Sequence, residues 1–378
     1  MRIGVPREIK DGERRVALLP GGVRVLCDDG HAVVVERGAG AAVGFDDDAY
    51  GAAGAALADA PDPVWSCDLV VKVKELQPPE YPRLAAGTTI CGFAQLGRDP
   101  ALLATVLAAG VRIIAWETIR DAHGQAPLLA PMSRIAGRLA PFAGAQALAT
   151  DRGGAGVLLT GVDDVPGAGV VVIGAGCAGA EAARVAASLG CRVTLVSRGA
   201  ARLDAAAAAI AAGGMRVTAR TLAALGEHGF ATAIAAADLV IGAVLEPGRL
   251  SPKLITRAHL RAMRAGSALV DIGIDQGGIA ETSRMTSLSA PTYVDERIVH
   301  YAVPNMPSLV ARTATLALAA AALPYLQRIA ASGVASALAE DAALAAGAMV
   351  WDGAVTDARL AADAALPVAH APWRARMR

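Results

Sequence analysis

The stretch VVVIGAGCAGAEAARVAASLG, residues 170–190, decides the fold of this chain. Four β-branched residues are followed at once by a glycine-rich turn, and the turn by an alanine-rich helical pattern. Within the turn, Gly174 permits a tight bend, Gly176 lets a ligand approach the backbone, and Gly179 lets the helix lie close to the strand. The stretch therefore predicts a strand, a turn and a helix that together bind a dinucleotide.

The residues that flank these glycines refine the prediction. Cys177 and Ala178 stand where the helix begins, and a helix N-terminus offers unpaired N–H groups to a phosphate. A second strand predicted at residues 192–196 ends in Ser197 and Arg198, not in the acid that would bind a ribose 2′-hydroxyl. A hydroxyl followed by a guanidinium suits a 2′-phosphate, so NADP(H) is favoured, with NAD(H) as the second choice. In the alternative without a cofactor role, Ser197 caps the next helix and Arg198 faces solvent.

Short apolar runs alternate with alanine-rich helical stretches along most of the chain, which predicts parallel sheets built from strand–helix–strand units. We expect two Rossmann-like α/β domains, each a doubly wound parallel sheet, separated by a cleft. The dinucleotide-binding domain is predicted at residues 130–306, after a turn bracketed by Pro127 and Pro131. A discontinuous substrate domain is predicted at residues 1–129 plus 307–378, and the tail after residue 355 shows no clear period. The predicted strands lie at residues 2–5, 32–36, 69–74, 88–92 and 111–116, and then at 170–173, 192–196, 238–242, 268–271 and 299–301.

Composition excludes several classes of function. The 378 residues carry 35 basic and 35 acidic side chains, and a net charge of zero offers no field to attract nucleic acid or an anionic membrane. The first twenty residues lack the apolar segment of a signal peptide, which predicts a cytoplasmic protein. The five cysteines form no CxxC pair, so we expect buried, reduced thiols and no metal site.

With these motifs in place, the sequence resembles the alanine dehydrogenase family, which shares its fold with the NAD(P) transhydrogenase alpha subunit. The phrase IDQGG at residues 274–278 favours the dehydrogenases and hence a stand-alone enzyme. The likeness extends from residue 1 to about residue 325. Its marks are MRIGVPREIKDGERRVALLP (1–20), LVVKVKE (69–75), APMSRIAGR (130–138), VVVIGAGCAG (170–179), ADLVIGAVLEPG (237–248), PKLIT (252–256), VDIGIDQGG (270–278) and VPNMPS (303–308).

The resemblance implies roles for three charged residues. Arg15 and Lys74 would hold the carboxylate and carbonyl of a substrate, and Asp275 would take part in proton handling. These residue types suit the roles, because Arg presents a planar fork to a carboxylate and Lys is a compact cation that polarises a carbonyl. Simpler structural roles are also open: Arg15 belongs to a run of surface-like charges, Lys74 ends a predicted strand, and Asp275 can cap a turn.

The sequence departs from the family at Gln95, where the resemblance implies a histidine that exchanges a proton with the substrate. A glutamine amide does not titrate near neutral pH. A different group can replace the histidine, with Asp275 first and His123 and His300 behind it, although a lone histidine is more often structural. Alternatively, the reaction is the reduction of an iminium, which already bears its proton and needs orientation more than an acid. A non-catalytic or transhydrogenase-like nucleotide-binding subunit is the third option.

The leading prediction is an NADP(H)-dependent oxidoreductase acting on a C–N bond of a small amino, imino or 2-oxo acid, in which Gln95 orients the substrate. A true alanine dehydrogenase with another proton donor is the alternative. The resemblance also implies a homo-oligomer. Six further positions match family positions around the nicotinamide and its ribose, and the apolar ones suit a hydrophobic core equally well: Ser133, Val244, Leu245, Ile272, Asn305 and Met306.

Overall fold

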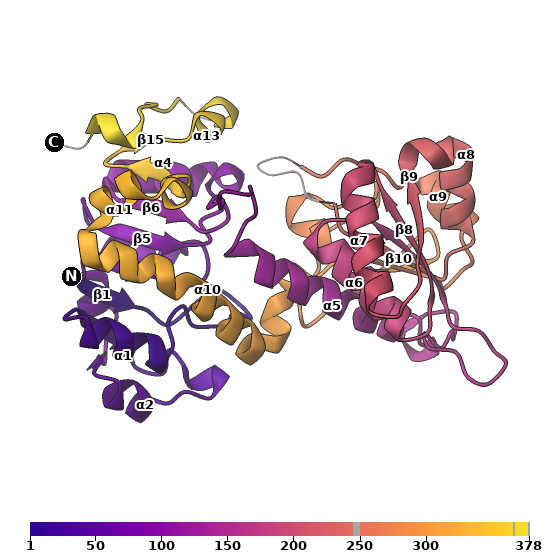
Figure 1. The fold of residues 1–378 in the computed structure, drawn as a ribbon, viewed down its shortest axis with the longest axis horizontal. Helices are drawn as coiled ribbons and strands as arrows, with labels where there is room; N and C mark the ends of the chain where they lie inside the picture. Colours follow the sequence, from indigo (N-terminus) through magenta and orange to yellow (C-terminus); the bar gives the residue numbers. More distant parts are fainter. Residues whose placement is uncertain (245–249, 366, 377–378) are drawn as a thin grey trace. The chain divides into compact units, whose positions relative to one another are not determined.

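The computed structural model describes residues 1–244, 250–365 and 367–376. The chain folds into two compact units, drawn in Figure 1. Unit 1 consists of Met1–Met132 and Ser308–Arg378, and unit 2 is Ser133–Pro307. Each unit is built on its own sheet with flanking helices, as expected of two Rossmann-like domains.

The sheet of unit 1 has eight strands in the order β15-β14-β6-β5-β4-β1-β2-β3. The six strands from β1 to β6 run parallel, and β14 and β15 add an antiparallel edge. From β1 the chain builds outward through β2 and β3, and then returns to build the other side through β4, β5 and β6. The order of strands therefore reverses between β1 and β4, where open α/β sheets bind ligands beyond the carboxyl ends of the strands. The strands are β1 (Arg2–Val5), β2 (Ala32–Glu36), β3 (Ala56–Ala58), β4 (Leu69–Val71), β5 (Thr89–Gly92), β6 (Arg112–Ala115), β14 (Ala348–Trp351) and β15 (Ala354–Val355).

Helices flank this sheet. The longest, α10 (Ala311–Ser332), contacts α1 and α11 (Figure 1). Its buried face includes Ala314, Leu318 and Leu326. With the turn before it, Met306–Ser332 is long and apolar enough to cross a membrane by length and composition alone, a test that the core helix of a globular unit also passes. The other helices are α1 (Pro20–Asp28), α2 (Asp47–Ala52), α3 (Asp62–Trp65), α4 (Pro100–Ala109), α11 (Val334–Glu340), α12 (Ala342–Ala345) and α13 (Ala358–Asp363).

Unit 2 has a seven-stranded sheet in the order β12-β13-β11-β10-β7-β8-β9. Strand β12 alone is antiparallel to its neighbour. The chain builds from β7 to one side through β8 and β9 and to the other through β10, so the order of strands reverses between β7 and β10. The strands are β7 (Gly169–Ile173), β8 (Arg192–Ser197), β9 (Thr218–Thr221), β10 (Leu239–Gly242), β11 (Ala268–Asp271), β12 (Thr292–Asp295) and β13 (Ile298–Tyr301), and the helices are α5 (Leu129–Ala147), α6 (Cys177–Ser188), α7 (Ala200–Ala212), α8 (Leu222–Ala235) and α9 (Arg257–Ala262).

The structure corrects three details of the prediction. The sheets are mixed, because antiparallel strands close one edge of each. Helix α5 begins at Leu129 and takes Pro131 into its first turn, where a proline costs little because the N–H groups there have no partner inside the helix. Finally, Cys177 is exposed and Cys27 is partly exposed, so only three of the five thiols are buried.

Candidate functional site

Polar side chains gather beyond the carboxyl ends of β1, β4, β5 and β6 in unit 1. The predicted residues Arg15, Lys74 and Gln95 lie on the chain segments that follow β1, β4 and β5, respectively. Arg15 and Lys74 are buried, with 2% and 5% of their surface exposed. Burial of a charged side chain is expensive unless partners compensate it, so these two residues are not members of a solvated surface run. Their partners define the site.

Arg15 is held by a carboxylate two residues before it. Its Nε donates to Glu13 Oε1 at 2.8 Å and its Nη2 to Glu13 Oε2 at 2.6 Å, which is the bidentate geometry of a strong ion pair. Its Nη1 points to the sulfur of Met132 at 3.0 Å. Thioether sulfur is a weak acceptor, and an incoming carboxylate is a better one. Glu13 thus orients Arg15. The Nη1 side of the guanidinium contacts the weakly accepting sulfur of Met132, a contact that a carboxylate could replace.

Lys72 forms a buried ion-pair network at the point where the order of strands reverses. Its Nζ lies 3.4 Å from Glu8 Oε2 and 3.1 Å from Glu80 Oε2, and all three side chains are at least 95% buried. Burial opposes the charge on Lys72, but the two carboxylates outweigh it and raise the pKa of the ammonium. Burial also raises the pKa of Glu8, although Lys72 works against that shift.

This network clamps the backbone that carries Lys74. Lys72 Nζ donates to the carbonyls of Lys74 at 3.0 Å and Glu75 at 3.3 Å. From the other side, Glu8 accepts the N–H groups of Val73 and Lys74. The ammonium of Lys74 itself lies 3.5 Å from Glu75 Oε2. The strand β4 ends at Val71, three residues earlier, so Lys74 does not end a strand but sits in this clamped segment.

Gln95 lies in a strained loop after β5. Its φ of 49° is in the left-handed region, which non-glycine residues adopt rarely and often at functional sites. The side-chain oxygen of Gln95 accepts a hydrogen bond from Arg98 at 2.9 Å. Its backbone N–H donates to Glu117 Oε1 at 2.7 Å. The predicted residue is therefore fixed by two neighbours.

Glu117 was missed by the sequence analysis. It lies just beyond the end of β6 and accepts the N–H groups of Ala94 and Gln95. Burial raises the pKa of this carboxyl, while the two N–H groups and the charge of Lys74 act in the opposite direction and do not cancel the shift. The signal that could have found it is an acid directly after an apolar strand, at the end of a parallel strand where open α/β sheets bind ligands.

His123 and His300 were the two histidines considered as replacements for the proton-exchanging histidine of the family. His300, on β13, is 1% exposed, and its Nε2 pairs with Thr282 Oγ1 at 2.8 Å while Nδ1 lies 2.9 Å from the carbonyl of Ile298. Burial lowers its pKa. Both ring nitrogens are thus used within the fold of unit 2. His123 is exposed in a turn held by Asp121.

In unit 2, the glycine turn lies between β7 and α6, at the reversal point of that sheet. Gly174 has a φ of 110°, and a Cβ there would lie 2.4 Å from the carbonyl oxygen of Ala243. A Cβ on Gly179 would lie 1.7 Å from the carbonyl oxygen of Gly174. These two glycines are required by the protein itself, the first by the turn and the second by close packing, as predicted.

Gly176 differs from its two neighbours. It is the N-cap residue of α6, with φ −77° and ψ −174°, a conformation open to any L residue. A Cβ built on it meets nothing within 4 Å. Nothing in the described protein therefore requires glycine here, whereas a diphosphate resting on the N-terminus of α6 does. The empty space beside Gly176 is therefore a second reason, besides the sequence pattern, to expect a nucleotide at this turn.

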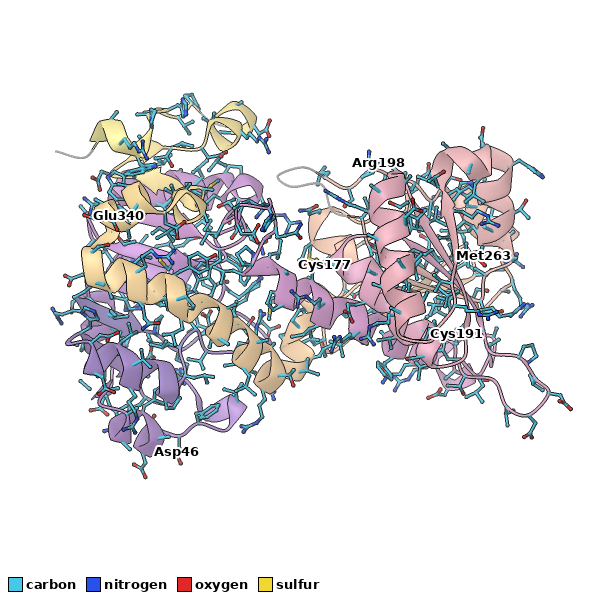
Figure 2. The ribbon with its side chains drawn as sticks, in the orientation of Figure 1. Asp46, Cys177, Cys191, Arg198, Met263 and Glu340 are labelled. Atoms are coloured by element: carbon cyan, nitrogen blue, oxygen red, sulfur yellow. The ribbon has the colours of Figure 1, made fainter. Side chains whose placement is uncertain are left out.

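At the end of β8, Ser197 is partly buried and Arg198 is exposed. The N-cap residue of the following helix α7 is Gly199, with no side-chain cap. The alternative that Ser197 caps this helix is therefore wrong. Figure 2 labels Arg198 together with Cys177, the first residue of α6.

Asp275 lies inside a short 3₁₀ helix, η5 (Ile272–Gln276), directly after β11. Asp271 and Gly277 are the two caps of that helix, so Asp275 is not a cap. The remaining predicted positions of unit 2 differ in burial. Met306 is 2% exposed and belongs to one hydrophobic cluster of the core, against which Ile272 is partly buried, whereas Val244 is partly buried against another cluster. Ser133 is partly buried, Asn305 adopts a φ of 59°, and Leu245 lies outside the described residues.

Asp271 is a second acid that the sequence analysis missed. Its Oδ2 accepts the N–H of Ile279 at 2.8 Å and the hydroxyl of Ser283 at 2.6 Å, which ties together the two ends of the loop that carries Asp275. Its Oδ1 is buried and has no hydrogen-bond partner within the described part of the chain. Burial raises the pKa of Asp271, more than these hydrogen bonds lower it.

Family models match both units of the chain. Residues 4–136 match the family model described as the N-terminal domain of alanine dehydrogenase/PNT, and residues 140–358 match the model of its C-terminal domain. An alanine dehydrogenase of Halomonas elongata is 46% identical over 94% of this chain and 95% of its own length. The corresponding enzyme of Bacillus subtilis is 43% identical over 96% and 94%, and that of Mycobacterium tuberculosis strain H37Rv is 42% identical over 97% and 98%.

Solved structures show the same likeness. A structure of L-alanine dehydrogenase superposes with a TM-score of 0.89 at 40% identity and covers 96% of this chain and 99% of that chain. A transhydrogenase from Sinorhizobium meliloti superposes with a TM-score of 0.80 at 25% identity, over 94% and 100%.

Proposed function

The chain belongs to the alanine dehydrogenase/PNT family and is a nicotinamide-nucleotide-dependent dehydrogenase acting on a C–N bond, and we propose that it interconverts a small amino acid and its 2-oxo acid with a preference for NADP(H). Alanine and pyruvate are the pair that the names of the relatives favour. The observation that carries the proposal is the pair of buried cations, Arg15 and Lys74, beyond the carboxyl ends of β1 and β4.

Unit 1 would hold the substrate through these cations. Arg15, oriented by Glu13, offers its Nη1 edge to a carboxylate. Lys74, whose backbone is clamped by Lys72 and Glu8, would polarise the carbonyl or imine as its carbon is reduced. Because both cations are buried, each contact with an anion is stronger than it would be in water. The site therefore selects a small, anionic substrate.

Unit 2 would hold the nucleotide. The turn from Gly174 to Gly179 would carry the diphosphate, with the open position at Gly176 beneath it. A bound nicotinamide nucleotide supplies or accepts a hydride. The residues of this chain would bind and orient it: Ser133, Val244, Leu245, Ile272, Asn305 and Met306 are proposed around the nicotinamide and its ribose, with Asp275 in proton handling. Burial of Met306 in the core argues that its part is indirect.

The preference for NADP(H) rests on Ser197 and Arg198. Ser197 is not engaged in capping α7, and Arg198 is exposed beside it, so a 2′-phosphate could receive a hydroxyl and a guanidinium. Arg198→Asp should shift the ratio of NADPH to NADH affinity by about 10- to 100-fold towards NADH, since charge-assisted hydrogen bonds contribute about 1.5–3 kcal/mol. Isothermal titration with both nucleotides measures the ratio. An unchanged ratio would contradict the 2′-phosphate role.

The activity is tested by following NADPH and NADH oxidation with pyruvate, glyoxylate and larger 2-oxo acids, each with and without ammonium. Turnover that needs both an oxo acid and ammonium supports the proposal. Arg15→Lys is the informative variant, because it keeps the charge but removes the fork that a carboxylate fits. We expect KM for the oxo acid to rise at least about tenfold.

A second candidate is the reduction of a preformed imine. It is favoured by Gln95, whose amide cannot exchange a proton and whose oxygen is engaged by Arg98. Cyclic imines belong in the same screen, and turnover of these without any turnover of oxo acid plus ammonium would select this candidate. A Gln95→His variant shows whether the site lacks only an acid. A non-catalytic subunit would oxidise neither cofactor.

Assembly into a homo-oligomer and a cytoplasmic location remain predictions. Light scattering on the purified protein measures the first, and fractionation of the source cells the second.

A further inference from the structure

Glu117 occupies a position in unit 1 that the proposed chemistry can use. The two N–H groups that it binds, those of Ala94 and Gln95, belong to the loop in which the family resemblance implies a proton-exchanging histidine. Its carboxylate lies 2.7 Å from the backbone nitrogen of Gln95. A carboxyl group therefore lies against the backbone of the loop that carries Gln95.

The surroundings of Glu117 suit a group that gains and loses a proton. The preceding residue, Trp116, is buried and packs edge-to-face on Phe93, with ring centroids 5.7 Å apart. The residue surface of Glu117 is only partly buried, but burial of its carboxyl raises the pKa of that group. The charged groups that act on it are Lys74, from the segment after β4, and Arg120, from its own segment. Gln95, on the loop after β5, carries no charge.

We propose that Glu117 is the proton-exchanging residue of this enzyme, in place of an imidazole at position 95. The inference rests on the proposed function, the interconversion of a 2-oxo acid and an amino acid. It also explains how Gln95 is compatible with that function, because a glutamine at this position keeps the backbone N–H that orients the Glu117 carboxylate.

In the proposed reaction, Glu117 takes up one proton and gives it back. An ammonium ion gives one proton to the Glu117 carboxylate and becomes ammonia. Its lone pair forms the C–N bond as the carbonyl π electrons move to oxygen, and one proton passes from that nitrogen to the oxygen to give the neutral carbinolamine. The acid form of Glu117 then protonates the carbinolamine hydroxyl. The C–O bond breaks, water leaves, and the nitrogen lone pair forms the C=N bond of the iminium. A bound nicotinamide nucleotide would supply the hydride that reduces this carbon to the amine, and would itself be oxidised. In the reverse direction, Glu117 accepts a proton from the attacking water.

The test is a double-mutant cycle between positions 117 and 95. In Glu117→Gln the amide oxygen still accepts N–H bonds, but the side chain no longer exchanges a proton. We expect kcat for amination to fall about 10²- to 10⁴-fold, with KM for the oxo acid little changed and one limb of the pH–kcat profile lost. In the Gln95→His background the same substitution should cost at least about tenfold less, because an imidazole takes over. Asp99→Asn, a carboxylate-to-amide change at the cap of α4, should leave kcat unchanged.

Three outcomes overturn the proposal. The first is a Glu117→Gln enzyme whose kcat stays within a few-fold of the wild type. The second is an equal loss in both backgrounds with an unaltered pH profile, which assigns Glu117 a structural role. The third is a wild type without turnover, which removes the proposed function as well and is thereby distinguished from the first two. Glu117→Asp keeps an acid at this position, so partial recovery of kcat in that variant separates lost chemistry from misfolding.

Discussion

The carboxyl-end regions of the two sheets are built on different principles. In unit 1 this region consists of buried ion pairs, such as Lys72 with Glu80 nearby in the chain and with Glu8 far from it in sequence. In unit 2 it is a turn of backbone, in which Gly174 and Gly179 are required by close contacts and Gly176 faces open space. The first region offers fixed charges, and the second offers N–H groups. The difference matches the two partners proposed for them, a small anion in need of orientation and a diphosphate.

The strongest expected effect follows from breaking the buried network of unit 1. Lys72→Met would leave Glu8 and Glu80 without their cation and free the segment that holds Lys74. Removal of one partner from a buried pair costs about 3–5 kcal/mol of unfolding free energy. All four tryptophans of the chain lie in unit 1, so denaturation followed by tryptophan fluorescence reports on this unit.

Arg37→Met is the matched control for that variant. Arg37 also pairs with two carboxylates, Asp47 and Asp59, but its side chain is 48% exposed. Exposed ion pairs contribute little, so its unfolding transition should stay close to that of the wild type. Equal losses in the two variants would show that burial does not set the strength of the Lys72 network.

A smaller loss of stability is expected from the backbone turn of unit 2. Gly179→Ala places a methyl group 1.7 Å from the carbonyl oxygen of Gly174, so the start of α6 must move. Overpacking of this kind costs about 1–3 kcal/mol. Thermal unfolding followed by circular dichroism should show a lower transition for unit 2, while tryptophan fluorescence of unit 1 stays unchanged. Wild-type melting of both units would contradict the close packing.

The mildest perturbation uses the exposed thiol of Cys177 as a reporter of the same turn. Cys177 is the first residue of α6, and Cys191 lies beyond the other end of that helix (Figure 2). A bound diphosphate should cover Cys177 and slow its alkylation about tenfold at a nucleotide concentration of roughly ten times Kd. Mass spectrometry of the labelled peptides measures the rate. Partly exposed Cys27, in unit 1, is the internal control, and equal slowing of both thiols would argue against a local effect.

The contrast between local motifs and contacts of distant residues also explains which parts of the fold could be predicted from the sequence. The strands at residues 2–5 and 32–36 were predicted with the bounds that β1 and β2 have, because buried parallel strands are continuous apolar runs. The edge strands β9 (TART) and β12 (TYVD) were missed, since they are short and mostly polar. Strand β14 was missed because its pairing with β6 joins distant parts of the chain.

The candidate site divides in the same way. The glycine turn is a local motif, and its three glycines can be assigned separate reasons from their spacing alone. The partners of Arg15, Lys74 and Gln95 could not be predicted, because only the folded sheet brings Glu8 to Val73 or Glu117 to Gln95. Glu117 was nonetheless predictable, because it directly follows the apolar run predicted as a strand at residues 111–116.

The most direct test of the account is the titration of wild type and Gly176→Val with NADPH by calorimetry. A valine at this position meets no described protein atom at its Cβ and its backbone angles are allowed, so the variant should unfold like the wild type. It should nevertheless bind NADPH at least about 100-fold more weakly, a change of about 2.7 kcal/mol, because the side chain takes the space proposed for the diphosphate. Equal affinity in the two proteins would place the nucleotide elsewhere and contradict the account.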